Sequence, residues 1–124
     1  MISYIVVGGV LGTLARYALQ GWVQKSSGVV MFPTGTLAVN LLGSLALGFL
    51  IRYGTGSAVF SPELRAGLTI GFCGAFTTMS TFSYESLRLL WDGEYWYAGL
   101  YLGGTVLGCL LAVLLGTALA NRLL

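Results

Sequence analysis

The feature that most constrains this sequence is its division into four long apolar stretches with short polar connections between them. The stretches run from Ile2 to about Val23, from Gly35 to Ile51, from Arg65 to Leu90 and from Trp96 to Leu119. The hydrocarbon core of a bilayer is about 30 Å thick and accommodates a helix of about 20 mostly apolar residues. We therefore expect an all-α integral membrane protein, with four transmembrane helices in a single domain over residues 1–124.

Charged residues make up only 8% of the chain, too few to cover a surface that faces water. The six basic and four acidic residues are scattered and form no basic patch, so nucleic acid is not an expected partner. The absence of histidine removes His-based triads and most zinc sites. Because no catalytic acid, base or nucleophile lies at membrane depth, we do not expect the protein to be an enzyme. The low charge content indicates that the lipid bilayer surrounds the chain.

The third stretch departs from simple hydropathy at its centre. Five of the ten residues from Gly74 to Ser83 carry a hydroxyl group. Hydroxyl side chains compete for backbone hydrogen bonds and lower helix propensity. A helix broken within the bilayer must be buried or lie beside water, because its freed backbone groups need partners. We expect a break at mid-membrane, near Gly74 to Thr78, marking a pathway or ion site; a continuous helix is the alternative.

Polar residues in the second and fourth stretches recur at every fourth position, which places them on one face of each helix. The stripes consist of Thr36, Asn40 and Ser44 in the second stretch and of Tyr101, Thr105 and Cys109 in the fourth. Two such stripes facing a broken third helix would line a narrow path. Neutral donors, with Arg16 as the one charge fully inside the membrane, suit a small anion better than a cation.

Two further patterns concern assembly. Glycines four residues apart let helices approach closely, and packing is the role we expect for the pairs Gly8/Gly12, Gly67/Gly71, Gly99/Gly103 and Gly104/Gly108.

With four spans, one side of the membrane carries three basic residues near span ends and the other carries two: Arg52, Arg65 and Arg122 against Lys25 and Arg88. Such a small difference permits insertion both ways up, and an antiparallel homodimer is then possible.

Two motifs make the sequence recognisable. The segment GFCGAFTTMSTFSYE from Gly71 to Glu85, with GTLAVN from Gly35 to Asn40, resembles the Fluc/CrcB family of fluoride channels. The resemblance covers essentially the whole chain. It implies a fluoride-selective channel that exports fluoride across the cell inner membrane and lowers its cytoplasmic concentration. It also implies a dual-topology, antiparallel homodimer with two pores.

The same resemblance implies roles for particular residues. The family's pore phenylalanines fall at Met79 and Phe82, its pore asparagine at Asn40, and its fourth-helix tyrosine and hydroxyl residue at Tyr101 and Thr105. Thr36, Ser80, Thr81 and Glu85 match further pore-associated positions, with Arg16 and Glu85 as vestibule charges. A structural sodium ion at the dimer centre is implied, held by the backbone carbonyls of Gly74 and Thr77 from each subunit.

One position departs from the family pattern, and two other functions stay open. Met79 stands where the family has phenylalanine, and its thioether offers no polarised ring edge to an anion. We expect the fold to survive and conduction to be altered or reduced. A small dual-topology, proton-coupled multidrug transporter would need a membrane-embedded carboxylate, yet Arg16 stands where the first span would need Glu. A non-conducting membrane assembly subunit is the other alternative.

Overall fold

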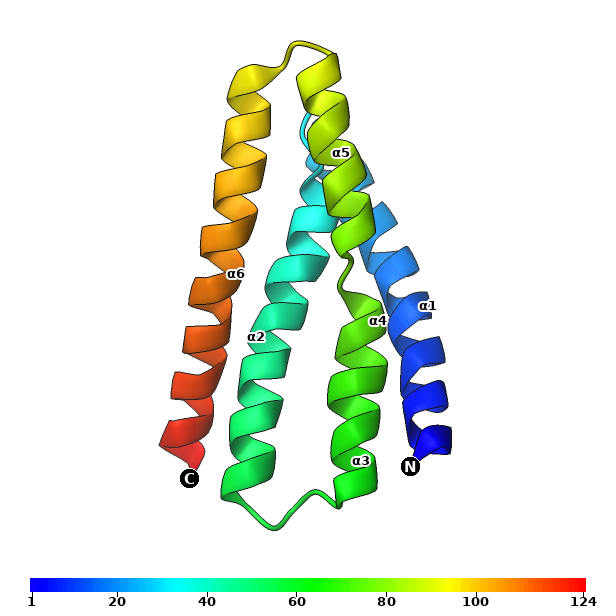
Figure 1. Ribbon diagram of the computed structural model, residues 1–124, viewed down its shortest axis with the longest axis vertical. Helices are drawn as coiled ribbons and strands as arrows, with labels where there is room; N and C mark the ends of the chain where they lie inside the picture. The colour runs from blue at the N-terminus through cyan, green and yellow to red at the C-terminus, as the bar shows by residue number, and fades with distance from the viewer.

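The computed structural model describes residues 1–124, which form helices and connections without any strand (Figure 1). Three continuous helices are long and apolar enough to cross a membrane: α1 (Ile2–Ser27), α2 (Thr34–Gly56) and α6 (Tyr95–Leu123). The third traverse in chain order lies between α2 and α6 and is not one continuous helix. Both termini lie at the same end of the molecule. The expected all-α architecture is confirmed.

The third traverse is built from four consecutive pieces instead of one helix. These are α3 (Pro62–Ala66), the π-helical segment η1 (Gly67–Cys73), α4 (Gly74–Phe76) and α5 (Met79–Trp91). Between α4 and α5, Thr77 and Thr78 are extended, with φ/ψ of −91°/158° and −148°/118°. The break therefore falls within the hydroxyl-rich centre, and the alternative of a continuous helix is wrong.

Local side-chain chemistry explains where the pieces of this traverse begin. Ser61 precedes α3, and its hydroxyl accepts a hydrogen bond from the Leu64 amide at 3.1 Å. Thr78 does the same for α5, because its hydroxyl accepts from the Thr81 amide at 3.3 Å. Such capping side chains satisfy amides that have no partner in the first helical turn. The helix that follows the break, α5, thus has a capped N-terminus.

The ends of the observed helices differ from the expected spans. α1 continues to Ser27, α2 to Gly56 and α6 to Leu123, several residues past the expected ends, and the third traverse begins at Pro62 instead of Arg65. The physical reason is that hydropathy locates the lipid-buried part, whereas a helix continues while its backbone bonds are satisfied. Basic side chains in such extensions can reach the headgroups and favour helix C-termini.

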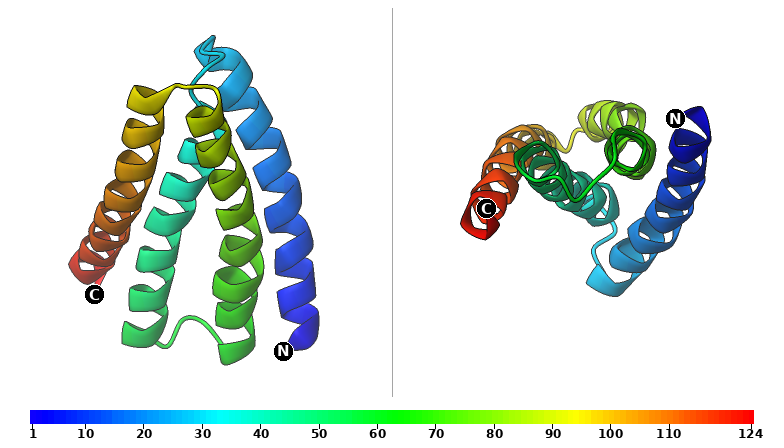
Figure 2. Two further views of the ribbon diagram at one scale, coloured as in Figure 1. Left: turned by 45° about the horizontal axis from the view of Figure 1, so that its top comes forward. Right: turned by 90° about the horizontal axis from the view of Figure 1, so that it is seen from below.

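Glycines set how closely the traverses pack. α1 contacts η1, and a Cβ atom added to Gly8 or Gly12 would meet the carbonyl of Gly67 or Phe72. α6 packs along α2 in the same way at Gly116 (Figure 2). The packing role predicted for the first two glycine pairs is therefore confirmed. In the last two pairs only Gly108 contacts another helix within this chain, at Leu41, while Gly99, Gly103 and Gly104 have open space around them.

Candidate functional site

The break in the third traverse is held by a side chain from another helix. The Oδ1 atom of Asn40, in α2, accepts a hydrogen bond from the Thr78 amide at 2.8 Å. The Nδ2 atom of Asn40 donates to the Thr78 carbonyl oxygen at 3.2 Å. The amide group thus pairs with both backbone groups of one extended residue, as a neighbouring strand would. Asn40 is buried, and we call this pairing the Asn40 clasp.

A second contact reaches the same region from α1. The Nε atom of Arg16 donates to the carbonyl oxygen of Ala75 at 2.9 Å. Ala75 lies in α4, in the last turn before the break. The Thr77 amide and hydroxyl both donate to the Cys73 carbonyl, at 3.1 and 3.0 Å. The chain around the break is therefore fixed by contacts from α1, from α2 and from its own preceding turn.

Further buried polar residues lie on α2 and α6. Thr36 is 1% exposed and its hydroxyl accepts from the Gln20 side-chain amide at 2.9 Å. Tyr101 is fully buried and its hydroxyl donates to the Glu85 carboxylate at 3.0 Å. The ring of Phe82 packs on that of Tyr101, with ring centroids 5.1 Å apart. The structure thus brings together four of the predicted site residues: Thr36, Phe82, Glu85 and Tyr101.

One buried hydroxyl has no partner. The Oγ1 atom of Thr105, one turn after Tyr101 on α6, makes no hydrogen bond within the chain, although the residue is only 5% exposed. A buried polar atom without a partner is unusual, because its desolvation costs about 1–3 kcal/mol. A hydroxyl in this state can donate to a bound anion.

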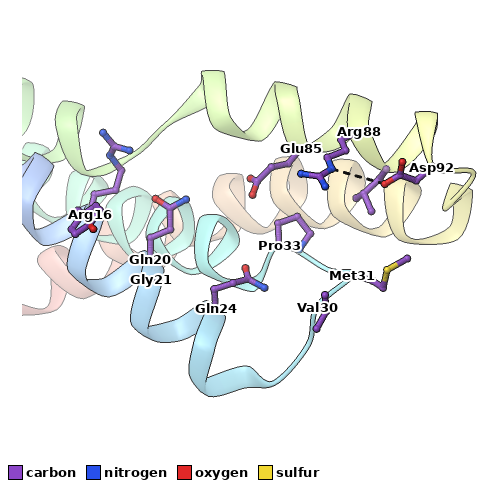
Figure 3. Close-up of a pocket in the computed structure, with 12 residues that line it drawn as sticks. Arg16, Gln20, Gly21, Gln24, Val30, Met31, Pro33, Glu85, Arg88 and Asp92 are labelled. Carbon is purple, nitrogen blue, oxygen red and sulfur yellow. Dashed lines mark ion pairs between the residues drawn. The ribbon is translucent and has the colours of Figure 1, made fainter.

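An open cavity of about 620 Å³ lies beside these residues, at the end of the molecule where α1 turns into α2 (Figure 3). Arg16, Gln20 and Gln24 line it from α1, and Glu85 and Arg88 line it from α5. Arg16 and Glu85, which were predicted as vestibule charges, both line this cavity. A vestibule of this kind would bring water and ions to the level of the break.

Other predicted site residues lie on a different face. Met79 is 72% exposed, and Ser80 is exposed as well. Thr81 is half-buried, and its hydroxyl accepts from the Thr78 hydroxyl at 3.1 Å. Within a single chain Met79 is therefore exposed, whereas Phe82, Asn40 and Tyr101 are buried.

The backbone at the break offers oxygen ligands. No amide or hydroxyl of the chain donates to the carbonyl oxygen of Thr77, while the neighbouring Thr78 carbonyl is taken by Asn40. Gly74 lies on the exposed side of α4, and the chain has no cluster of metal-binding side chains. Oxygen donors of this type fit a hard cation. The arrangement is thus compatible with a cation held by backbone atoms.

Two residues of the site were missed from the sequence. Gln20 contacts Thr36, and Gln24 shapes the connection from α1 to α2 by donating to the carbonyls of Val29 and Phe32 and accepting from the Gly35 amide. Their signal is their spacing, because both follow Arg16 at steps of four on one helix face. Gln20 interrupts an otherwise apolar stretch, and a polar residue at that depth needs a partner.

Comparison with known proteins supports a single family. The family model described as "CrcB-like protein, Camphor Resistance (CrcB)" matches residues 3–117. A protein of Geotalea uraniireducens named "Fluoride-specific ion channel FluC" is 48% identical over 122 residues, which are 98% of each chain. A protein of Methanosarcina acetivorans named "Fluoride-specific ion channel FluC 1" is 47% identical over 98% of this chain and 92% of its own. With nearly the whole length matched and the helices apolar, the chain belongs to the CrcB family of integral membrane proteins.

Proposed function

We propose that this chain is a fluoride-selective ion channel that exports fluoride across the cell inner membrane and so lowers its cytoplasmic concentration. The names of relatives at 47–48% identity support the fluoride specificity. The family membership also disfavours the proton-coupled multidrug transporter. Fluoride and the lipid bilayer are accordingly the partners that we assign to the protein.

The observation that carries this proposal within the structure is the buried, unpaired hydroxyl of Thr105. It follows Tyr101 by one turn on α6, the helix that packs on α2, and both residues are buried. Fluoride is a small anion that accepts strong hydrogen bonds, and fixed neutral donors can replace its water. Chloride is larger and accepts more weakly, so a narrow path lined by these donors favours fluoride.

Ion flux from reconstituted liposomes tests the proposal. Vesicles loaded with potassium fluoride should release fluoride when a potassium ionophore is added, as read by a fluoride-selective electrode. Vesicles loaded with potassium chloride should release almost nothing under the same conditions. Comparable fluoride and chloride fluxes would refute selectivity, and the absence of any flux would favour the non-conducting assembly subunit.

We also propose that two copies assemble as an antiparallel, dual-topology homodimer. The exposed face around the break supports this, because Ser80 and Ser83 are exposed where hydrocarbon would surround a lone chain. Met79, on the same helix, is 72% exposed. The Ser83 hydroxyl donates to the Met79 carbonyl at 2.9 Å, and the Ser80 hydroxyl lies 3.4 Å from the Thr78 hydroxyl. Their remaining lone pairs would still face hydrocarbon around a lone chain, which is unfavourable, and a second copy would cover them. The near-equal distribution of basic residues permits this second copy to insert upside down.

Cysteine labelling tests the orientation. In a chain with Cys73 and Cys109 replaced by alanine, Lys25→Cys places one thiol at the exposed end of α1. Dual topology predicts that an impermeant maleimide labels about half of the molecules from outside sealed vesicles, and the rest after the vesicles are opened. Labelling from one side only would rule out dual topology.

We further propose a structural sodium ion at the dimer centre, held by the carbonyls of Gly74 and Thr77 from each copy. The Thr77 carbonyl without a donor supports this proposal. Replacing sodium with a large organic cation during purification and assay should then lower both thermal stability and fluoride flux. If both stay unchanged after prolonged exchange and no bound sodium is detected, the structural ion is excluded.

A further inference from the structure

Arg16 makes a contact that a vestibule charge does not require. Its Nε atom donates to the carbonyl of Ala75, which is 59 positions away in the sequence. That carbonyl belongs to the last turn of α4, which ends at Phe76. The last carbonyls of a helix have no donor within the helix, and lipid offers none. Arg16 supplies that donor and places a positive charge at the negative end of the helix dipole.

The cavity contains a second arginine that differs from Arg16 in this respect. Arg88 lines the same cavity and pairs only with Asp92, at 4.0 Å, where both side chains are largely exposed. Figure 3 shows Arg16 extending from α1 toward the ribbon of the third traverse, while Arg88 and Asp92 lie together at the far end. Two cations of equal charge thus border one cavity, and only Arg16 is tied to the break.

We propose that Arg16 is a positioning residue whose guanidinium fixes the end of α4, and with it the extended Thr77 and Thr78, in the geometry that conduction needs. Asn40 holds the break from the α2 side, so the two contacts act on opposite ends of the extended segment. The effect on flux rests on the proposed channel function. The effect on the break rests on the fold alone.

Lysine substitution separates position from charge. Lysine has a methylene group where arginine has Nε, so Arg16→Lys keeps the positive charge and loses the donor at that point. Arg16→Gln loses both. Arg88→Lys and Arg88→Gln are the matched controls, because they make the same two changes at the other arginine of the cavity, which pairs only with Asp92 and does not contact the break.

Hydrogen exchange of the dimer in detergent, read by mass spectrometry, tests the effect on the break. The amides of Thr77 and Thr78 are both hydrogen-bonded in the native chain, to Cys73 and to Asn40. Loss of a hydrogen bond from a charged donor should raise their exchange about tenfold or more in both Arg16 variants. In the Arg16 variants, peptides from α6 should exchange as they do in the unchanged protein. In both Arg88 variants, all peptides should do so, including those that contain Thr77 and Thr78. Native exchange at Thr77 and Thr78 in either Arg16 variant would overturn the proposal.

Fluoride efflux at a series of fluoride concentrations tests the functional consequence. Positioning predicts that both Arg16 variants lower the maximal flux and leave the half-saturating fluoride concentration unchanged. A role as cavity charge predicts instead that Arg16→Lys conducts normally, and that Arg16→Gln and Arg88→Gln both raise the half-saturating concentration; this result would also overturn the proposal. If the unchanged protein passes no fluoride, the proposed channel function fails, and the exchange measurement alone decides the role of Arg16.

Discussion

Replacing Asn40 with leucine should both destabilise the protein and abolish fluoride flux. Leucine has a similar size but can neither accept from the Thr78 amide nor donate to the Thr78 carbonyl. A buried amide without a partner costs about 1–3 kcal/mol and the weaker carbonyl bond about 1, so we expect a loss of about 2–4 kcal/mol. Leucine regains nothing from burial, because the lipid around the protein is as apolar as its side chain.

The assay combines thermal unfolding of the detergent-solubilised protein with fluoride efflux from liposomes. Ser44→Ala is the matched control for the melting temperature, since Ser44 lies one turn after Asn40 on the same helix and outside the clasp. The dimer should still form at low temperature, but it should melt earlier than the control. Native stability of Asn40→Leu would show that the clasp does not hold the break. Undiminished flux would remove Asn40 from the pathway.

Three further substitutions probe other parts of the structure. Met79→Phe should raise fluoride efflux with unchanged melting, because the exposed position accepts a ring and the ring edge attracts an anion; an unchanged or lower flux would contradict this. Gly116→Ala should lower stability by about 1–3 kcal/mol in thermal unfolding because its Cβ would meet backbone of α2, whereas Gly103→Ala has open space in the chain and serves as control. Tyr101→Phe should lower efflux with a loss of only about 0.5–1.5 kcal/mol, since it removes one hydrogen bond, to Glu85; native efflux would place that hydroxyl outside the pathway.

The sequence was informative wherever structure depends on local composition. Apolar length indicated the spans, and the hydroxyl-rich centre of the third stretch indicated the break that the structure places at Thr77 and Thr78. The partners at the break could not be predicted, because the clasp and the Arg16 contact join residues 38 and 59 positions apart. Such contacts depend on how four helices are rotated about their axes, which the helix period leaves undetermined. Asn40 was accordingly expected as a free pore donor, and its contact with Thr78 was not foreseen.

The polar groups inside the molecule fall into two sets. Those that fix the break have partners within the chain, as Asn40 has in Thr78. Others are left over: the Thr105 hydroxyl and the Thr77 carbonyl have no partner. An amide NH2 group has two hydrogens, so Asn40 can hold Thr78 with one and still offer the other to an anion. The Asn40 side chain can therefore both hold the break and line the proposed pathway. A shift of the break would also move the hydrogen-bond donors that line the pathway, so changes at Asn40 should affect stability and flux together. Changes at Thr105, which holds no other part of the chain, should affect flux alone.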